Sequence, residues 1–281
     1  LNVGLGLNSG QYVTGSNNTA IGHQSMMGSS GNSTVNSSTA VGYQSLKAIT
    51  TGASNTAVGA YAGDAINTGS SNSAFGKSAL TTNTNGIRNT AIGETSMQDN
   101  DSGGYNVAVG RESLFRNVTG SYNTAVGHSA LNGVNANSHS ENTAVGYYAL
   151  GGISTGNGNL ALGFKSSKSL TIGGGNISLG YESLENATAI SRAIFIGKST
   201  GHGITSSTDP NGTIGIGYFA LSALTDGQYN TAVGYEAGKT MTTANNNSFF
   251  GHSSGRLNTG GGNSGFGTYS HYSLSTGGNN T

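Results

Sequence analysis

The chain has 281 residues, of which 49 are glycine, one is proline and none is cysteine, and only 8% are charged. Eleven basic residues balance eleven acidic ones without a basic cluster, so we expect neither nucleic acid nor an anionic membrane surface as a partner. The absence of cysteine excludes a disulfide framework and a thiolate zinc site, and no apolar run reaches the ~20 residues of a membrane-spanning helix.

A five-residue motif repeats along the whole chain. It is clearest as Asn-Thr-Ala-Val-Gly at 123–127, and sixteen copies can be counted from their closing glycines. The most regular copies share their first, fourth and fifth residues: Asn55, Val58 and Gly59; Asn89, Ile92 and Gly93; Asn123, Val126 and Gly127; Asn142, Val145 and Gly146. Such a glycine-rich composition is typical of disorder, but a disordered chain has no reason to place a large apolar residue before every motif glycine. The repeat therefore predicts a solenoid, in which each coil buries its apolar side against its neighbours.

The expected strands end at these glycines, and their spacing defines the coils in chain order. From Gly42 to Gly127 the step is 17 residues at every copy, and three longer steps lead to Gly42, Gly146 and Gly217. We predict an all-β, parallel β-solenoid (a β-roll or β-helix) of about sixteen 17-residue coils. We expect it to form a single repeat domain over 1–281 that is a fragment of a longer fibre.

Within each strand, the residue before the glycine and the residue two positions earlier share one face, while the other carries Ala or Gly, with Phe195 and Phe249 as large exceptions. We expect the larger residue to point into the coil and to form a thin core with a Leu or Met that follows the glycine, such as Leu46 or Met97. Two large side chains contribute roughly 1.5 to 3 kcal/mol each, against about 1 to 2 kcal/mol of backbone ordering per residue. Because a lone solenoid is then poorly stabilised, we expect the Ala and Gly face to contact other copies in a parallel homotrimer.

Two other positions recur with the motif. The leading Asn is present in thirteen of the sixteen copies, and we expect it to hydrogen-bond to its equivalents in adjacent coils. A second glycine, such as Gly52 or Gly86, lies seven residues before the motif glycine in ten copies. We expect this glycine to supply a positive φ at a turn.

The motif, followed by a small residue and Leu and separated by Thr-Gly turns, resembles the head repeats of trimeric autotransporter adhesins of the YadA type, which carry Asn-Ser-Val-Ala-Ile-Gly. It is also similar to the repeat arrays of bacteriophage tail fibres and related virion fibre proteins. The resemblance covers the whole chain and implies a trimeric parallel β-solenoid on a virion or cell surface. It further implies that the aliphatic residue before glycine points into the coil and that the Ala lies nearer the subunit contact.

The residue after each motif glycine is variable, and in six coils it is Tyr or Phe: Tyr43 in the first half of the chain, and Tyr147, Phe164, Tyr181, Tyr218 and Tyr235 in the second. Such rings in consecutive coils should stack about 4.8 Å apart. Stacked rings among polar residues can bind sugars, so the five in the second half are the candidate glycan-binding residues; a ladder that only stiffens the rod is the alternative. We expect no metal within one chain, because His23, His128 and His252 lie too far apart along the repeat. We also expect no cofactor and no catalytic residue, because no serine, histidine and acid grouping stands apart from the repeat.

These features favour a structural fibre segment rather than an enzyme. The expected role is a rigid shaft of a phage tail fibre or virion appendage, which presents receptor-binding parts for host attachment at the virion surface. The alternative is a bacterial trimeric adhesin or extracellular filament that binds glycan or matrix at the cell surface. Ice binding is a third alternative, suggested by a partial column of threonines that Val107 and Leu160 interrupt.

Overall fold

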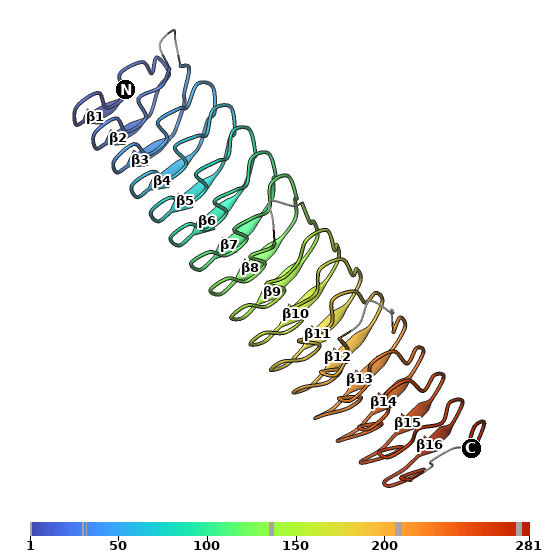
Figure 1. Ribbon diagram of the computed structural model, residues 1–281. Coiled ribbons are helices and arrows are strands. Elements are labelled where there is room, and N and C mark those ends of the chain that lie inside the picture. Colours follow the sequence, from blue (N-terminus) through green and yellow to red (C-terminus); the bar gives the residue numbers. More distant parts are fainter. Residues whose placement is uncertain (1, 30, 32, 135–137, 206–209, 274–276) are drawn as a thin grey trace. The chain divides into compact units, whose positions relative to one another are not determined.

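The computed structural model describes residues 2–29, 31, 33–134, 138–205, 210–273 and 277–281. The chain divides into two compact units, Leu1–Glu141 and Asn142–Thr281. Each unit is a parallel β-solenoid built from coils of about 17 residues with one short strand per coil (Figure 1). The predicted all-β solenoid is therefore confirmed. The described residues contain no helix that is long and apolar enough to cross a bilayer.

Within its described residues, each unit has eight three-residue strands. Those of the first unit are β1 (Val3–Leu5), β2 (Thr19–Ile21), β3 (Thr39–Val41), β4 (Thr56–Val58), β5 (Ser73–Phe75), β6 (Thr90–Ile92), β7 (Val107–Val109) and β8 (Thr124–Val126). Those of the second are β9 (Thr143–Val145), β10 (Leu160–Leu162), β11 (Ile177–Leu179), β12 (Ile194–Ile196), β13 (Ile214–Ile216), β14 (Thr231–Val233), β15 (Ser248–Phe250) and β16 (Ser264–Phe266).

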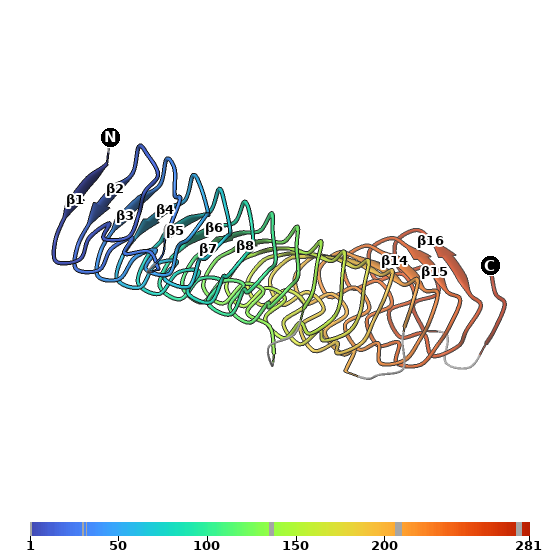
Figure 2. The same cartoon turned by 90° about the horizontal axis from the view of Figure 1, so that it is seen from above.

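Consecutive strands within a unit pair in parallel, one coil apart and with equivalent motif positions in register. Thr39 is opposite Thr56, for example, and Leu160 is opposite Ile177. In the first unit the strand arrows lie along one side of the coils and the looped turns along the other (Figure 2). A side chain at a given motif position therefore lies directly above its equivalent in the next coil, which turns the sequence repeat into columns on the surface.

In most strands the larger residues lie on the outside of the coil, so our prediction of the inner face was wrong. Ala57 and Ala91, at the centres of β4 and β6, are fully buried, whereas Val58 and Ile92 beside them are 36% and 41% exposed. Val126 and Val145 lie on the outer face in the same way. The implied placement of the Ala at a subunit contact is wrong for the same reason, because the Ala methyl groups point into their own coil.

The narrow interior explains this arrangement. The Leu or Met four residues after the motif glycine is buried, as at Leu46 and Met97, and it reaches the strand from the opposite wall. Leu221 shows the contact: its Cδ1 lies 3.5 Å from the point where a Cβ on Gly215, the centre of β13, would stand. A small residue at the strand centre leaves room for the Leu, and the larger strand residues are consequently directed outward.

Phe195 replaces the central Ala of β12, and two glycines make room for its ring. A Cβ on Gly201 would lie 2.6 Å from Phe195 Cε1, and a Cβ on Gly215 would lie 2.9 Å from Phe195 Cδ1. Gly201 occupies the usual Leu position of the same coil, and Gly215 occupies the usual Ala position of the next. Phe249 in β15 has the same arrangement, with Gly255 and Gly265 against its ring. The interior volume is thus conserved across coils while the residues that fill it change.

The leading Asn residues form the hydrogen-bonded ladder that we predicted. Asn55 Oδ1 accepts the backbone N–H of Asn72 at 2.9 Å, and Asn55 Nδ2 donates to the carbonyl of Gly69 at 2.8 Å. The pattern repeats at the other regular copies, including Asn89, Asn123 and Asn142. Because these side chains are buried, each amide satisfies turn backbone groups that would otherwise be left without a partner.

Glycine is required at two places in the coil, for different reasons. The motif glycine has a strongly positive φ, 135° at Gly59, and a Cβ there would lie 2.6 Å from the carbonyl oxygen of Gly76 in the next coil. The second glycine does not have a positive φ, so our prediction for it was wrong. A Cβ on Gly86 would lie 2.5 Å from the carbonyl oxygen of Gly103. Close approach of consecutive coils, rather than backbone conformation, excludes a side chain at that position.

Three further positions in the coil adopt a left-handed conformation, in many coils with side chains other than glycine. They lie five residues before, two after and four after the motif glycine, as at Ser71, Ser78 and Leu80 around Gly76. The turn backbone is held by hydrogen bonds between coils: Ser78 N–H donates to the carbonyl of Ala60 at 2.9 Å, and Leu80 N–H donates to that of Ser96 at 2.9 Å. These bonds over-determine the conformation, which is why residues other than glycine are retained there.

Candidate functional site

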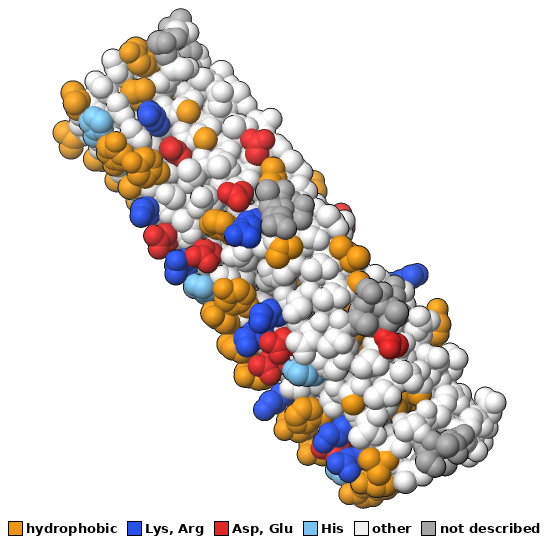
Figure 3. All heavy atoms as spheres, in the orientation of Figure 1, with side chains coloured by type: hydrophobic (Ala, Val, Ile, Leu, Met, Phe, Trp, Pro, Cys, Tyr) orange, Lys and Arg blue, Asp and Glu red, His pale blue; other side chains and the backbone are white. Residues whose placement is uncertain are grey.

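The residues that follow the motif glycines form a column along one edge of the strands, which we call the edge column. In the first unit its chemically distinctive members are His23, Tyr43, Lys77, Glu94, Arg111 and His128. In the second they are Tyr147, Phe164, Tyr181, Lys198, Tyr218, Tyr235 and His252. Within each unit, hydrophobic and charged side chains gather along one edge, while the rest of the visible face is mostly small polar side chains and backbone (Figure 3).

The aromatic members of the second unit stack as predicted. The ring centroids of Tyr147 and Phe164 are 5.3 Å apart with planes 12° from parallel, and those of Phe164 and Tyr181 are 5.1 Å and 9°. Tyr218 stacks on Tyr235 in the same way, at 5.2 Å and 9°. All five candidate residues therefore lie in one column, in two runs.

Lys198 separates these two runs. Its Nζ lies 5.5 Å from the ring centroid of Tyr181 and 5.8 Å from that of Tyr218. Both distances allow an attractive cation–π contact, so the ammonium group covers the ring faces at the gap. The column is continuous in contact although it is not continuously aromatic.

This stacking limits how the five candidate residues can contact a sugar. Phe164 has a tyrosine ring against each of its faces, and it covers in turn one face of Tyr147 and one face of Tyr181. What the run offers to solvent is ring edges and phenol hydroxyls, together with the flanking Lys165, whose Nζ lies 5.1 Å from the Phe164 centroid. A glycan would be held at this site through hydrogen bonds and edge contacts rather than by a pyranose laid flat on a ring.

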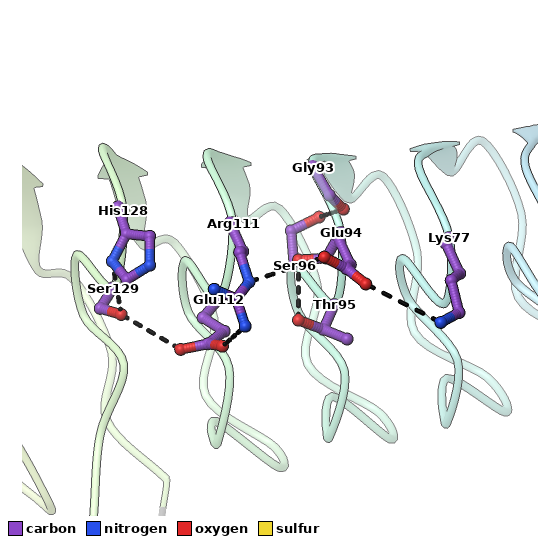
Figure 4. A network of polar contacts seen from close by, with 9 residues as sticks. All are labelled: Lys77, Gly93, Glu94, Thr95, Ser96, Arg111, Glu112, His128 and Ser129. Atoms are coloured by element: carbon purple, nitrogen blue, oxygen red, sulfur yellow. Dashed lines mark hydrogen bonds and ion pairs between the residues drawn. The ribbon is translucent and has the colours of Figure 1, made fainter.

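The edge column of the first unit is ionic (Figure 4). Glu94 lies between Lys77, with Nζ to Oε1 of 3.9 Å, and Arg111, with Nε to Oε2 of 3.6 Å. Arg111 also contacts Glu112 at 2.8 Å. The charges of Lys77, Glu94 and Arg111 alternate from one coil to the next, so neighbouring side chains attract each other. Since these side chains are about half exposed, each pair contributes only about 0 to 1 kcal/mol.

Glu236 of the second unit is better enclosed than Glu94 and Glu112 of the first. Glu236 accepts from Lys239 Nζ at 2.7 Å and from Arg256 Nε at 2.6 Å. The hydrogen bond from Lys239, followed by that from Arg256, keeps the pKa of Glu236 below its ordinary value. Arg256 Nη1 in turn donates to the Tyr272 hydroxyl at 2.7 Å. These contacts connect neighbouring coils across the turn beside the edge column.

Among the residues that the structure describes, Glu182, Glu185 and His202 form a group whose possible metal-ligand atoms all lie within 4.8 Å of one another. Sequence reasoning missed the cluster, although the spacing of 17 residues between Glu185 and His202 could have revealed it. Lys165 and Lys168 lie 3.6 and 4.0 Å from Glu185. Because these two ammonium groups already compensate the negative charge of Glu185, the cluster forms an ion-pair network.

A surface hollow of about 650 Å³ lies beside the turns of the first unit. Among the described residues its lining includes Tyr12, Met27, Lys47 and Asp64. Burial raises the pKa of the Asp64 carboxyl above its ordinary value. One carboxyl opposite one ammonium group does not make a nucleophile and base pair, so the hollow suggests no reaction.

The outer strand face exposes a series of large apolar side chains. In each unit it consists of two columns: the residue before the motif glycine and the residue two positions earlier. The well-exposed members of the first column include Ile21, Val58, Phe75, Ile92, Val126, Val145, Leu162, Phe250 and Phe266. The second column is mainly Thr in the first unit and includes Leu160, Ile177, Ile194 and Ile214 in the second.

Comparison with protein-family models finds no match for this chain, and comparison with curated proteins finds no similar one. The resemblance to tail-fibre and adhesin repeats therefore remains a prediction from the motif.

Proposed function

We propose that the chain is a structural segment of an extracellular fibre, such as a phage tail fibre or virion appendage, assembled as a parallel homotrimer. In this role the repeats set the length and stiffness of a shaft, and other parts of the assembly contact the host. The feature that supports it is the outer strand face, which runs through every coil of both units and leaves large apolar side chains in solvent.

The physical argument is one of incomplete burial. The interior of the coils is filled by the central Ala, by the Leu or Met four residues after the motif glycine and, in many coils, by an Ile or Leu seven residues after it, such as Ile49 or Ile153. The Val, Ile, Leu or Phe before the glycine is nevertheless over a third exposed at the positions named above. Monomeric proteins rarely expose contiguous apolar patches of more than about a few hundred Å². Packing three such faces around a common axis would bury them and add the stabilisation that one thin solenoid lacks.

A bacterial surface adhesin that binds glycan is the second candidate, and the edge column favours it. The run Tyr147, Phe164 and Tyr181 offers hydroxyls and ring edges beside Lys165 and Glu182. A glycan array would test this proposal: binding that is lost in Tyr147→Ala and Tyr181→Ala would support the adhesin. An array with no binding would leave the shaft as the better account.

The mass of the chain in solution tests the leading proposal. Light scattering should give three times 28.0 kDa for a trimer. A monomer would contradict the proposal and leave the flat face of Thr and aliphatic columns open to solvent. A thermal hysteresis assay would then decide whether that face binds ice.

A further inference from the structure

Two pairs of tyrosines occupy equivalent positions in consecutive coils. Tyr218 and Tyr235 lie in the edge column, with ring centroids 5.2 Å apart and planes 9° from parallel. Tyr105 and Tyr122, five residues before their motif glycines, are 5.1 Å apart at 16°. All four side chains are exposed, from 39% at Tyr218 to 61% at Tyr122. The parallel register of the coils sets this arrangement, since residues 17 apart lie directly above one another.

We propose that these two pairs are sites of oxidative dityrosine cross-linking, which joins consecutive coils of one chain covalently. The oxidant is hydrogen peroxide acting through an external haem peroxidase. Each phenol loses one electron and one proton and becomes a phenoxyl radical with spin density on its ortho carbons. The two radicals combine in a new carbon–carbon bond, and the ortho hydrogens move to the oxygens to restore the phenols. The pair thus loses two hydrogens overall, and one peroxide is reduced to two waters.

The geometry favours coupling within each pair over other reactions of the radicals. In a parallel, in-register stack each ortho carbon faces its counterpart, so the bond can form after a rotation about the side-chain torsions. The exposure of both rings allows electron transfer to an external enzyme. Tyr43 and Tyr61 are also neighbours, at 5.2 Å, but their planes are 80° apart. The edge of one ring faces the other there, so the ortho carbons are not opposed.

The same column contains a control for this idea. Tyr147 and Tyr181 are 43% and 46% exposed, so they should be oxidised as readily as the paired tyrosines. Phe164 lies between them, and its ring has no phenol to oxidise. Lys198 separates Tyr181 from Tyr218 in the same way. Tyr147 and Tyr181 are therefore expected not to couple to each other in the native sequence. Tyr148 also neighbours Tyr147, at 4.6 Å, but their planes are 72° apart, as in the pair of Tyr43 and Tyr61.

The experiment is to treat the whole chain, at low protein concentration, with haem peroxidase and limiting peroxide. Dityrosine fluorescence measures the yield, and mass spectrometry of peptides linked with the loss of two hydrogens maps the bonds. We expect links between Tyr218 and Tyr235 and between Tyr105 and Tyr122. Tyr235→Phe should remove about half of the fluorescence, and the double variant Tyr122→Phe with Tyr235→Phe should reduce it to background.

Phe164→Tyr provides the gain-of-function test, because it places a third phenol between Tyr147 and Tyr181. Fluorescence should rise above the native level, and a link that includes residue 164 should be found. Circular dichroism of each variant before oxidation checks that the fold is unchanged. Links that join separate chains, links between Tyr147 and Tyr181, or a yield unaffected by the double variant would each overturn the proposal. These outcomes do not depend on the oligomeric state, because the expected bonds lie within one chain.

Discussion

At the scale of single residues, His139 is a buried imidazole in a place where other coils have glycine. It lies seven residues before Gly146 and is 1% exposed, and neither ring nitrogen has a hydrogen-bond partner. Its backbone carbonyl accepts from Asn123 Nδ2 at 2.8 Å, as the glycine carbonyls do elsewhere in the ladder. Burial lowers the pKa of His139 from 6.5 to about 4, so the ring is neutral in the folded chain at neutral pH.

This shift predicts a loss of stability in mild acid. Because the pKa of His139 is lower in the folded than in the unfolded chain, the unfolded chain takes up the proton first as the pH falls. The free energy of unfolding should therefore decrease between about pH 6.5 and about pH 4, by at most about 3 kcal/mol. Thermal unfolding near pH 7 and near pH 5 measures it. His139→Gly should reduce the pH dependence, whereas His252→Gln should keep it; an equal dependence in His139→Gly would contradict the assignment.

Ser71 tests the left-handed positions. It is exposed and has a φ of 61°, a conformation that costs an ordinary residue about 1 to 2 kcal/mol and costs glycine little. Ser71→Gly should therefore raise the free energy of unfolding by about 1 kcal/mol, and Ser71→Val should lower it. Thr68→Gly is the matched control, because this exposed residue lies in the same turn without a positive φ and should lose stability. Chemical denaturation compares the three variants, and a destabilised Ser71→Gly would show that the left-handed conformation is not costly there.

At the scale of one coil, the Phe195 packing predicts that a residue common elsewhere in the repeat is harmful. Gly201→Leu restores the usual Leu, but its Cβ would overlap the ring of Phe195, and overpacking of this kind costs about 1 to 3 kcal/mol. The double variant Phe195→Ala with Gly201→Leu rebuilds the common interior and should recover much of that loss. A double-mutant cycle in urea measures the coupling. Additive effects of the two changes would mean that the two residues do not share one space.

The elements show what could be predicted from the repeat. The period of 17 was sufficient for the parallel solenoid, and the recurring Asn55, Asn89 and Asn123 were sufficient for the ladder, because both depend on spacing and residue type. The inner face was predicted wrongly because a strand such as Thr90–Ile92 has two faces and the rule that large residues are buried selects the wrong one. The side chain of Met97, on the opposite wall of the coil, determines which face of the strand is inside. The strand's own sequence gives no sign of that contact.

The candidate site was predictable to the same degree. Equal spacing placed Tyr147, Phe164 and Tyr181 in a stack, and their contacts bear this out. Glu182, Glu185 and His202 were missed, because the turn that brings two motif positions together is held by backbone hydrogen bonds between coils. The backbone at turn residues such as Lys165 and Glu182 has a positive φ. Lys and Glu do not indicate that conformation, so the sequence does not reveal it.

At the scale of the whole molecule, neighbouring residues of β6 can test which face makes the contacts between chains. Ile92 lies on the outer face and is 41% exposed, whereas Ala91 is fully buried inside its own coil. If three chains pack through the outer face, Ile92→Asp places a charge in that contact at a cost of about 3 kcal/mol or more, which weakens association by more than about a hundredfold. The variant should be a folded monomer, with the native circular dichroism and one third of the native mass in light scattering.

Ala91→Asp should behave in the opposite way, because its carboxylate would enter the interior without a partner and the coil would unfold locally or globally. Glu94→Gln, in the exposed edge column, serves as the control and should change neither the mass nor the fold. An Ile92→Asp variant that keeps the native mass would place the contact elsewhere on the coil. A folded but dissociated Ala91→Asp would restore the Ala face as the contact. The adjacent substitutions therefore separate stability within a coil from association between chains.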